Sequence, residues 1–150
     1  KKSLKQDGQK DSTKDGMDAA ICMIDLETNQ LHYSGANRPL WIVQNGEIQE
    51  IKATKVAVAG FTPDEQVFEE HIIPLSSDLK FYMSSDGYAD QFGGIKGKKL
   101  KVKTMKQIIL DHCNADFTTQ KNVLHDHLIE WMGDHEQIDD VCVVGFQMKG

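Results

Sequence analysis

The sequence lacks the features that would assign it to several common classes. There is no run of about 20 apolar residues such as a membrane-spanning helix needs, and the longest apolar stretches, such as residues 19–24, are far shorter. The basic N-terminal residues are not followed by an apolar segment, so they do not resemble a secretory signal. The net charge of −6 repels nucleic-acid phosphates, so we expect no nucleic-acid partner.

Cysteine is scarce, and motifs for a covalent nucleophile are missing. Cys22, Cys113 and Cys142 are an odd number at no metal-ligand spacing, which is typical of reduced thiols in a cytosolic protein. We therefore expect a cytoplasmic location. The motif Gly-x-Ser-x-Gly is absent and no cysteine stands in a catalytic motif, which disfavours covalent catalysis.

The first 14 residues differ in composition from the rest of the chain. They are rich in lysine and aspartate and almost devoid of apolar residues, so we expect a flexible leader at residues 1–14. The chain begins without Met, and we expect it to continue from an upstream segment. The remaining residues, 15–150, are expected to belong to a single domain.

Hydrophobic patterning predicts consecutive strands. The expected strands cover residues 17–26, 30–36, 40–43, 48–51, 68–73, 79–83 and 141–146. Apart from Asp18 and Asp25, residues 17–26 are apolar or small on both faces, which predicts a central strand covered on both sides, and the last strand is also expected to be buried. Asn45-Gly46 is a strong hairpin signal between its two flanking strands.

The pattern changes to a helical period after residue 98. Apolar residues at 102, 105, 109 and 113 predict one amphipathic helix, and residues 123, 127 and 131 predict a second, with Gly133 as its C-terminal cap. A glycine- and lysine-rich segment at residues 93–97 is interpreted as a mobile loop or flap. The fold class is therefore α+β, with a mainly antiparallel sheet covered by two C-terminal helices.

Acidic residues stand at the ends of two predicted strands. Asp86 follows the strand at 79–83, and the pair Asp139-Asp140 precedes the strand at 141–146. If these strands pair antiparallel, the carboxylates meet and need a hard cation such as Mg²⁺ or Mn²⁺. The alternative for each is an ordinary turn or strand entry. Asp18 is a third acidic position, for which a turn and a functional role are equally favoured.

Four stretches, taken in order, resemble a known family. They are Asp-Gly-Met-Asp-Ala-Ala (15–20), Tyr-Ser-Gly-Ala-Asn-Arg-Pro-Leu (33–40), Tyr-Met-Ser-Ser-Asp-Gly-Tyr-Ala-Asp-Gln-Phe-Gly-Gly (82–94) and Gln-Ile-Asp-Asp-Val (137–141). Together they resemble the sporulation-protein-E (SpoIIE-like) metal-dependent phosphatases, a bacterial branch of the protein phosphatase 2C-like superfamily. An unrelated α+β domain would require all four ordered matches to be accidental.

The resemblance implies a fold and a site. The family fold is an α-β-β-α sandwich with a two-metal site for Mn²⁺ or Mg²⁺ at one edge of the sheets. Asp86 and Asp139 match metal-binding aspartates of the family. Gly87, Asp140 and Asp18 are candidates for neighbours of the ligands rather than ligands themselves.

The resemblance also implies an activity, namely hydrolysis of phosphoserine or phosphothreonine on a partner protein by a metal-activated water. The implied partners are an anti-anti-sigma-type regulator as substrate and an upstream sensor, which could be membrane-anchored with this chain at its cytoplasmic end. The Gly-Asp strand and the Asp-x-x-Gly-His-Gly segment that begin family domains do not occur here. We therefore expect the C-terminal portion of a domain, inactive alone, with an uncovered edge that favours a homodimer or domain swap. The alternative is a non-catalytic interaction module on the same scaffold.

Overall fold

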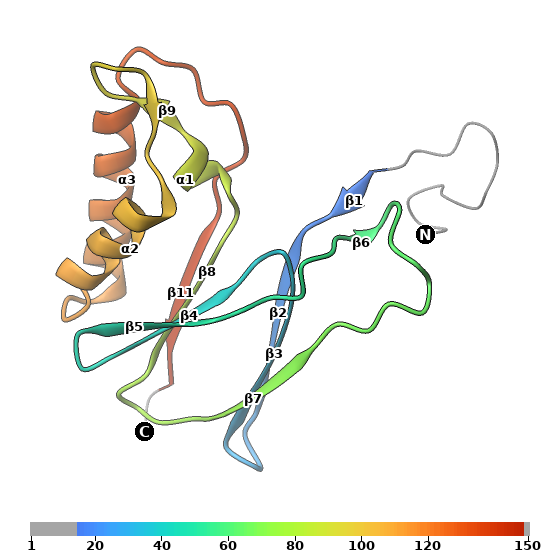
Figure 1. Ribbon diagram of the computed structural model, residues 1–150. Helices are drawn as coiled ribbons and strands as arrows, with labels where there is room; N and C mark the ends of the chain where they lie inside the picture. Colours follow the sequence, from blue (N-terminus) through green and yellow to red (C-terminus); the bar gives the residue numbers. More distant parts are fainter. Residues whose placement is uncertain (1–14, 149–150) are drawn as a thin grey trace. The chain divides into compact units, whose positions relative to one another are not determined.

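The computed structural model describes residues 15–148, which form two compact units (Figure 1). Within the described residues, the first unit comprises residues 15–40 and 50–76, and the second comprises residues 41–49 and 77–148. The leader expected at residues 1–14 lies outside the described residues. Mixed strands and helices with mostly antiparallel pairing confirm the α+β class. Among residues 15–148, no helix is long and apolar enough to cross a membrane.

The first unit is built on a three-stranded antiparallel sheet. Its strands, in spatial order, are β2 (Ala19–Asp25), β3 (Gln30–Ala36) and β7 (Glu70–Pro74). A short pair, β1 (Gly16–Met17) with β6 (Val58–Ala59), lies in the same unit. Leu31 and Tyr33 of the middle strand are fully buried, so one face of this sheet carries the core of the unit.

The prediction that residues 17–26 form a central, doubly covered strand is wrong. β2 pairs with β3 alone and therefore lies at an edge of its sheet. Ile21 and Met23 remain 68% and 55% exposed, whereas Cys22, on the opposite face, is half-buried and burial raises the pKa of its thiol to about 11. The apolar pattern favours burial of both faces of the strand, but the described residues cover only the face that carries Cys22.

A four-stranded sheet lies largely in the second unit. In spatial order its strands are β11 (Val143–Gln147), β8 (Lys80–Ser84), β4 (Leu40–Gln44) and β5 (Glu47–Ile51). The predicted hairpin between β4 and β5 is confirmed, and Asn45 and Gly46 adopt the positive φ angles of 52° and 77° that its turn requires. The last strand was predicted to be buried, but β11 is an edge strand and Val144 is 44% exposed.

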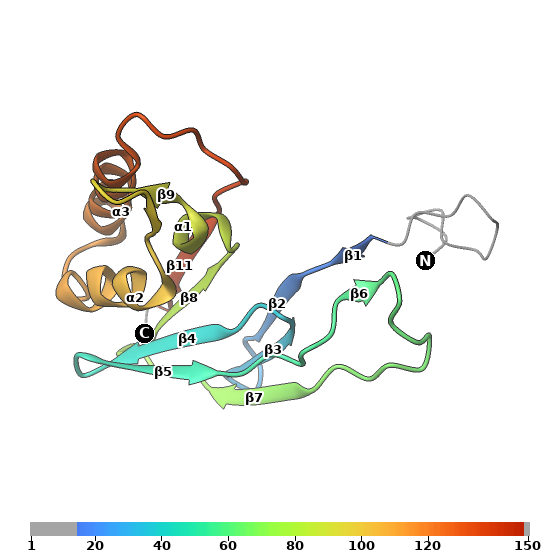
Figure 2. The same ribbon diagram turned by 45° about the horizontal axis from the view of Figure 1, so that its top comes forward.

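Three helices accompany this sheet. They are α1 (Gly87–Asp90), α2 (Val102–Asp111) and α3 (Phe117–Met132). α2 and α3 lie on one side of β8 and β11 (Figure 2), and their apolar side chains join those of the sheet in one core cluster. α3 ends at Gly133, whose φ of 52° confirms the predicted cap. Its buried face, however, is rotated from the predicted one and carries Leu124 and Leu128.

The glycine- and lysine-rich segment is not an open loop. It forms a hairpin of two short strands, β9 (Phe92–Gly93) and β10 (Lys98–Lys99). The backbone N–H of Gly94 donates to the carbonyl of Trp131 at 2.8 Å. A side chain at Gly93 would collide with the same carbonyl, so glycine is required for the hairpin to pack on the end of α3. The flap interpretation is therefore corrected to an anchored hairpin.

Candidate metal centre

The candidate centre lies where β8 ends and β11 begins. The two strands pair antiparallel, with Ser84 opposite Val143. The residues that follow β8 therefore lie beside the residues that precede β11, because antiparallel strands bring opposite chain ends together. The adjacency that the sequence predicted for Asp86 and the Asp139-Asp140 pair is confirmed at the level of the backbone.

Ser85 fastens this junction. Its backbone N–H donates to the carbonyl of Cys142 at 2.9 Å. Its Oγ donates to the carbonyl of Asp140 at 2.8 Å and accepts from the N–H of Cys142 at 2.9 Å. Three hydrogen bonds from one residue hold the Asp86 turn in register with the chain before β11, and sequence reasoning gave Ser85 no role. The signal that could have found it is the small hydroxyl residue directly before the Asp-Gly pair.

Gly87 makes the close approach possible. A Cβ built on Gly87 would overlap the carbonyl oxygen of Asp140 and would lie 2.9 Å from its carbonyl carbon and 3.3 Å from the Asp139 carbonyl oxygen. Gly87 is buried, and the backbone of α1 therefore packs directly on the backbone carbonyls of Asp140 and Asp139. The Asp-Gly pairing in the sequence thus has a steric cause in addition to its turn preference.

The two predicted ligands differ in their surroundings. Asp86 is half-buried at the N-terminal cap of α1, and its carbonyl accepts from the N–H of Asp90 at 2.9 Å. Asp139 is exposed, and its Oδ1 accepts from the N–H of Asp140 at 2.7 Å. Oxygen donors of this kind suit Mg²⁺ or Mn²⁺, and Asp139 keeps a second carboxylate oxygen for such a cation.

The donor set in the described part of the chain is small. Among residues 15–148, no group of three or more His, Cys, Asp or Glu side chains is arranged to hold a metal ion. The chemistry of Asp86 and Asp139 fits a hard cation, but two carboxylates leave most of its coordination to water or to other groups.

Asp18 belongs to the first unit and has local partners. Its carboxylate accepts from Asn37 Nδ2 at 2.8 Å and from Arg38 at 2.5 Å. Partial burial alone would raise the pKa of Asp18, but these hydrogen bonds and the charge of Arg38 outweigh burial and hold the pKa below its usual value. Asp18 therefore connects the start of β2 to the turn after β3 by hydrogen bonds. The sequence did not identify Arg38 as its partner.

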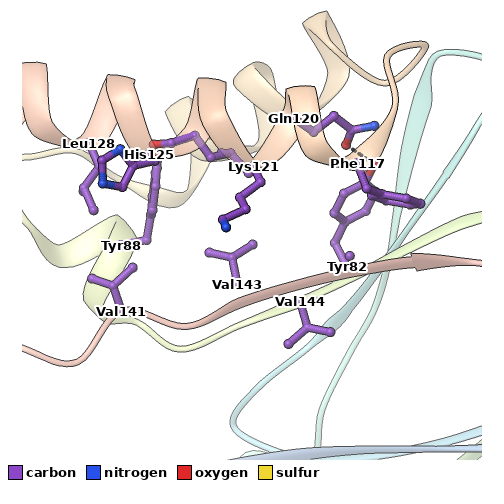
Figure 3. A pocket seen from close by; sticks show the side chains of 12 residues that line it. Tyr82, Tyr88, Phe117, Gln120, Lys121, His125, Leu128, Val141, Val143 and Val144 are labelled. Atoms are coloured by element: carbon purple, nitrogen blue, oxygen red, sulfur yellow. Dashed lines mark hydrogen bonds between the residues drawn. The ribbon is translucent and has the colours of Figure 1, made fainter.

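A groove separate from the acidic junction runs between α3 and β11 (Figure 3). It encloses about 450 Å³, and its walls are largely apolar. Two phenols close its floor: Tyr82 donates to Gln120 Oε1 at 2.6 Å, and Tyr88 donates to the Leu124 carbonyl at 2.8 Å. Burial raises the pKa of each tyrosine to about 12. The groove has no carboxylate in its lining, so it is not the metal centre.

The fold of this chain is found in a known class of domain. The SiaA-PP2C domain of Pseudomonas aeruginosa is similar with a TM-score of 0.79 and 28% identity, over 88% of this chain and 52% of that structure. The fold is thus that of protein phosphatase 2C-type domains. More particularly, the chain belongs to the SpoIIE family, because the family model of stage II sporulation protein E matches residues 2–149.

Two further solved structures share the fold at lower identity. The phosphatase domain of the cell fate determinant SpoIIE from Bacillus subtilis, presoaked with Mn, has a TM-score of 0.64 and 16% identity over 87% of this chain and 56% of that one. The PPM Ser-Thr phosphatase MsPP from Mycobacterium smegmatis has a TM-score of 0.57 and 14% identity over 98% and 67%. No curated protein sequence is significantly similar. The chain spans about half the length of the SiaA and SpoIIE domains.

Proposed function

We propose that this chain contributes Asp86 and Asp139 to the two-metal centre of a serine/threonine protein phosphatase. The observation that carries the proposal is the β8–β11 junction, where the Ser85 hydrogen bonds bring the Asp86-Gly87 turn against the Asp139-Asp140 backbone. Membership of the SpoIIE family and the phosphatase names of the similar structures support it.

The roles of the chain's own residues follow from their surroundings. A bound Mn²⁺ or Mg²⁺ would supply Lewis-acid activation of a water molecule for attack on phosphorus. Asp86 and Asp139 hold negative charge at the junction, and the N–H of Asp140 fixes one oxygen of Asp139. Gly87 and Asp140 act through the backbone, because their close packing sets the spacing between the two acidic turns.

Two carboxylates bind such cations weakly, because Mg²⁺ and Mn²⁺ rely on several oxygen ligands. Since the chain spans 52% of the SiaA domain, we propose that the remaining ligands come from the part of the domain that this chain does not span. By itself the chain is then expected to turn over phosphoserine peptides slowly or not at all. Robust Mn²⁺-dependent turnover by the isolated chain would contradict this expectation.

The substrate proposal is a phosphoserine or phosphothreonine on a partner protein of the anti-anti-sigma type, in a cytoplasmic pathway controlled by an upstream sensor domain. It is supported by the family and by the names of the similar structures, one of which is a cell fate determinant. A test is dephosphorylation of a phosphorylated regulator by the complete domain, compared with the same regulator carrying the phosphate on tyrosine. Preference for the tyrosine phosphate would contradict the proposal.

The experiment that tests the centre is a calorimetric Mn²⁺ titration of the chain and of Asp86→Asn. Asp134→Asn is the matched control, because Asp134 is an exposed aspartate of the same unit. We expect weak binding to the chain and to the control, and a loss of about tenfold or more in Asp86→Asn, since a carboxylate ligand is replaced by a neutral amide. Equal Mn²⁺ binding by all three proteins would contradict the assignment of Asp86 as a metal ligand.

The alternative, a non-catalytic interaction module, is favoured by one feature of the first unit. Met23, His32 and Ile72 stand opposite one another across β2, β3 and β7, and Met23 and Ile72 are each more than half exposed. We propose that a second copy of the chain covers this face, as a homodimer or by domain exchange. Light scattering should show a dimer that Met23→Glu dissociates and Val67→Glu, an exposed loop control, does not. A monomer at all concentrations would refute this.

A further inference from the structure

The charge of the chain is unevenly distributed. Residues 91–110 contain six lysines and no acidic residue, although the chain as a whole carries a net charge of −6. Five of these lysines are exposed and lie on the β9–β10 hairpin, on the turn after it or in the first turn of α2: Lys96, Lys98, Lys99, Lys101 and Lys103. This lysine hairpin, residues 92–103, is a positive patch on a negative protein, and such patches attract negatively charged partners.

The lysine hairpin is held in place at its base. The N–H of Gly94 donates to the Trp131 carbonyl at 2.8 Å, and Trp131 Nε1 donates to the Gln91 carbonyl at 3.1 Å. Gln91 Nε2 in turn donates to the Glu136 carbonyl at 2.9 Å. Because these bonds join the start of the hairpin to the end of α3 and to the segment that follows α3, its lysines are presented without a large ordering cost on binding.

The tip of the hairpin is apolar. Ile95 has a relative exposure of 107%, the value of a side chain with no protein contact. An isolated exposed apolar residue is ordinary, but here it is surrounded by exposed lysines on an anchored turn. A polar rim around an apolar anchor is the pattern of a protein-protein contact, whereas an apolar tip contributes nothing to nucleic-acid phosphate binding.

Lys101 lies at a backbone position that suits glycine. Lys101 has φ of 77°, a conformation that is costly for a residue with a side chain. Its N–H donates to the Ala89 carbonyl at 2.7 Å, which ties the hairpin to α1. A glycine would remove the strain and keep this bond, so the backbone conformation does not itself require a lysine at position 101.

The hairpin also adjoins the candidate metal centre. Lys99 Nζ lies 2.8 Å from Asp90 Oδ2, and the N–H of Asp90 donates to the Asp86 carbonyl at 2.9 Å. A single helical turn, α1, therefore separates the lysine hairpin from the proposed ligand Asp86. A partner seated on the hairpin would have its neighbouring residues close to the acidic junction.

We propose that the lysine hairpin docks an acidic surface of the phosphorylated protein substrate, with Ile95 as its apolar anchor. The proposal rests on the proposed phosphatase function for the identity of the partner. It assigns substrate recognition to residues outside the metal centre, so that binding through the hairpin does not require a bound metal.

The test measures binding in EDTA, which separates docking from the metal centre. The probe is a fluorescein-labelled peptide with one phosphoserine flanked by glutamates and leucine, followed by fluorescence anisotropy. Lys96→Glu/Lys98→Glu is compared with Lys52→Glu/Lys55→Glu, a matched charge reversal at exposed lysines of the first unit. At about 50 mM NaCl we expect the hairpin variant to bind about tenfold or more weakly and the control to change less than about threefold. At about 300 mM NaCl the difference should shrink.

Ile95→Ser supplies an arm that leaves the charge unchanged, and we expect it to weaken binding about three- to tenfold at both salt concentrations. Equal weakening in both charge-reversal variants would overturn the proposal, because it would show a general charge effect. Stronger binding to duplex DNA or to anionic vesicles than to the peptide would also overturn it. If Asp86→Asn abolishes Mn²⁺ binding and leaves peptide binding intact, both proposals stand. If the hairpin binds the peptide and Asp86→Asn leaves Mn²⁺ binding unchanged, the docking proposal is supported. The same result contradicts only the proposed metal centre.

Discussion

Replacing Gly87 by alanine tests the packing that creates the acidic junction. The added Cβ would lie 2.9 Å from the Asp140 carbonyl carbon and would overlap the carbonyl oxygen, whereas ordinary contacts fall at 3.4–4 Å. The Asp140 peptide must therefore retreat from α1. Because Ser85 Oγ donates to the same carbonyl at 2.8 Å, the retreat lengthens that hydrogen bond as well.

The expected magnitude combines these two effects. Overpacking in a well-packed region costs about 1–3 kcal/mol, and a weakened hydrogen bond adds about 1 kcal/mol. We expect Gly87→Ala to lower the free energy of unfolding of the second unit by about 2–4 kcal/mol. Gly46→Ala is the matched control, because Gly46 has positive φ and open space around it, so it reports backbone strain alone, about 1–2 kcal/mol.

Urea unfolding followed by tryptophan fluorescence is the appropriate assay. Both tryptophans of the chain, Trp41 and Trp131, lie in the second unit, so their emission reports the unit that contains Gly87. The unfolding midpoint should fall by about 1–2 M with an unchanged slope. A loss no greater than that of Gly46→Ala would refute the reasoning, because it would mean that the Asp140 peptide can move without cost.

Two further outcomes follow from the hydrogen bonds. Tyr82→Phe leaves buried Gln120 Oε1 without its phenol donor and should cost about 1–3 kcal/mol by the same fluorescence assay, whereas Tyr88→Phe removes a donor from a helix carbonyl and should cost less; equal costs would contradict this. The pKa of Asp18 is lowered in the folded state beside Arg38, so its stabilisation is present above the unfolded pKa, about 3.9, and is lost as pH falls through the lower folded value. Asp18→Asn should therefore be less stable than the wild type at pH 6, measured by thermal circular dichroism, and the difference should shrink as the pH falls below about 3.9; a difference independent of pH would exclude this origin.

Local signals in the sequence were sufficient for most elements. The Asn45-Gly46 turn, the Gly133 cap and the existence of α2 each depend on residues close in sequence, and each was predicted correctly. The antiparallel pairing of β8 with β11 is a long-range contact. It could be predicted only by assuming that the two acidic strand ends meet. The Ser85 bridge and the Gly87 contact depend on that pairing, so the hydroxyl residue before the Asp-Gly pair could mark a candidate but could not identify its partners.

The errors arose where a pattern has more than one structural solution. Residues 123, 127 and 131 and residues 120, 124 and 128 both recur at helical spacing, and packing against the sheet selected the second stripe for α3. The Asp18–Arg38 ion pair, at 2.5 Å, could not be anticipated because a turn residue has many potential partners. An acidic residue in a motif therefore required the structure before a structural role could be separated from a ligand role.

The wrongly predicted strand has an energetic meaning of its own. Fully burying an Ile or Met side chain contributes about 1.5–3 kcal/mol, yet Ile21 and Met23 remain mostly exposed in β2. The same strand buries Cys22 against the other face well enough to raise the pKa of the thiol to about 11. When a strand has apolar residues on both faces and only one face is covered, covering the other face would contribute several kcal/mol, about the amount expected from burying two such side chains. Whatever covers this face, by our proposal a second copy, should therefore stabilise the first unit more than any single contact within it.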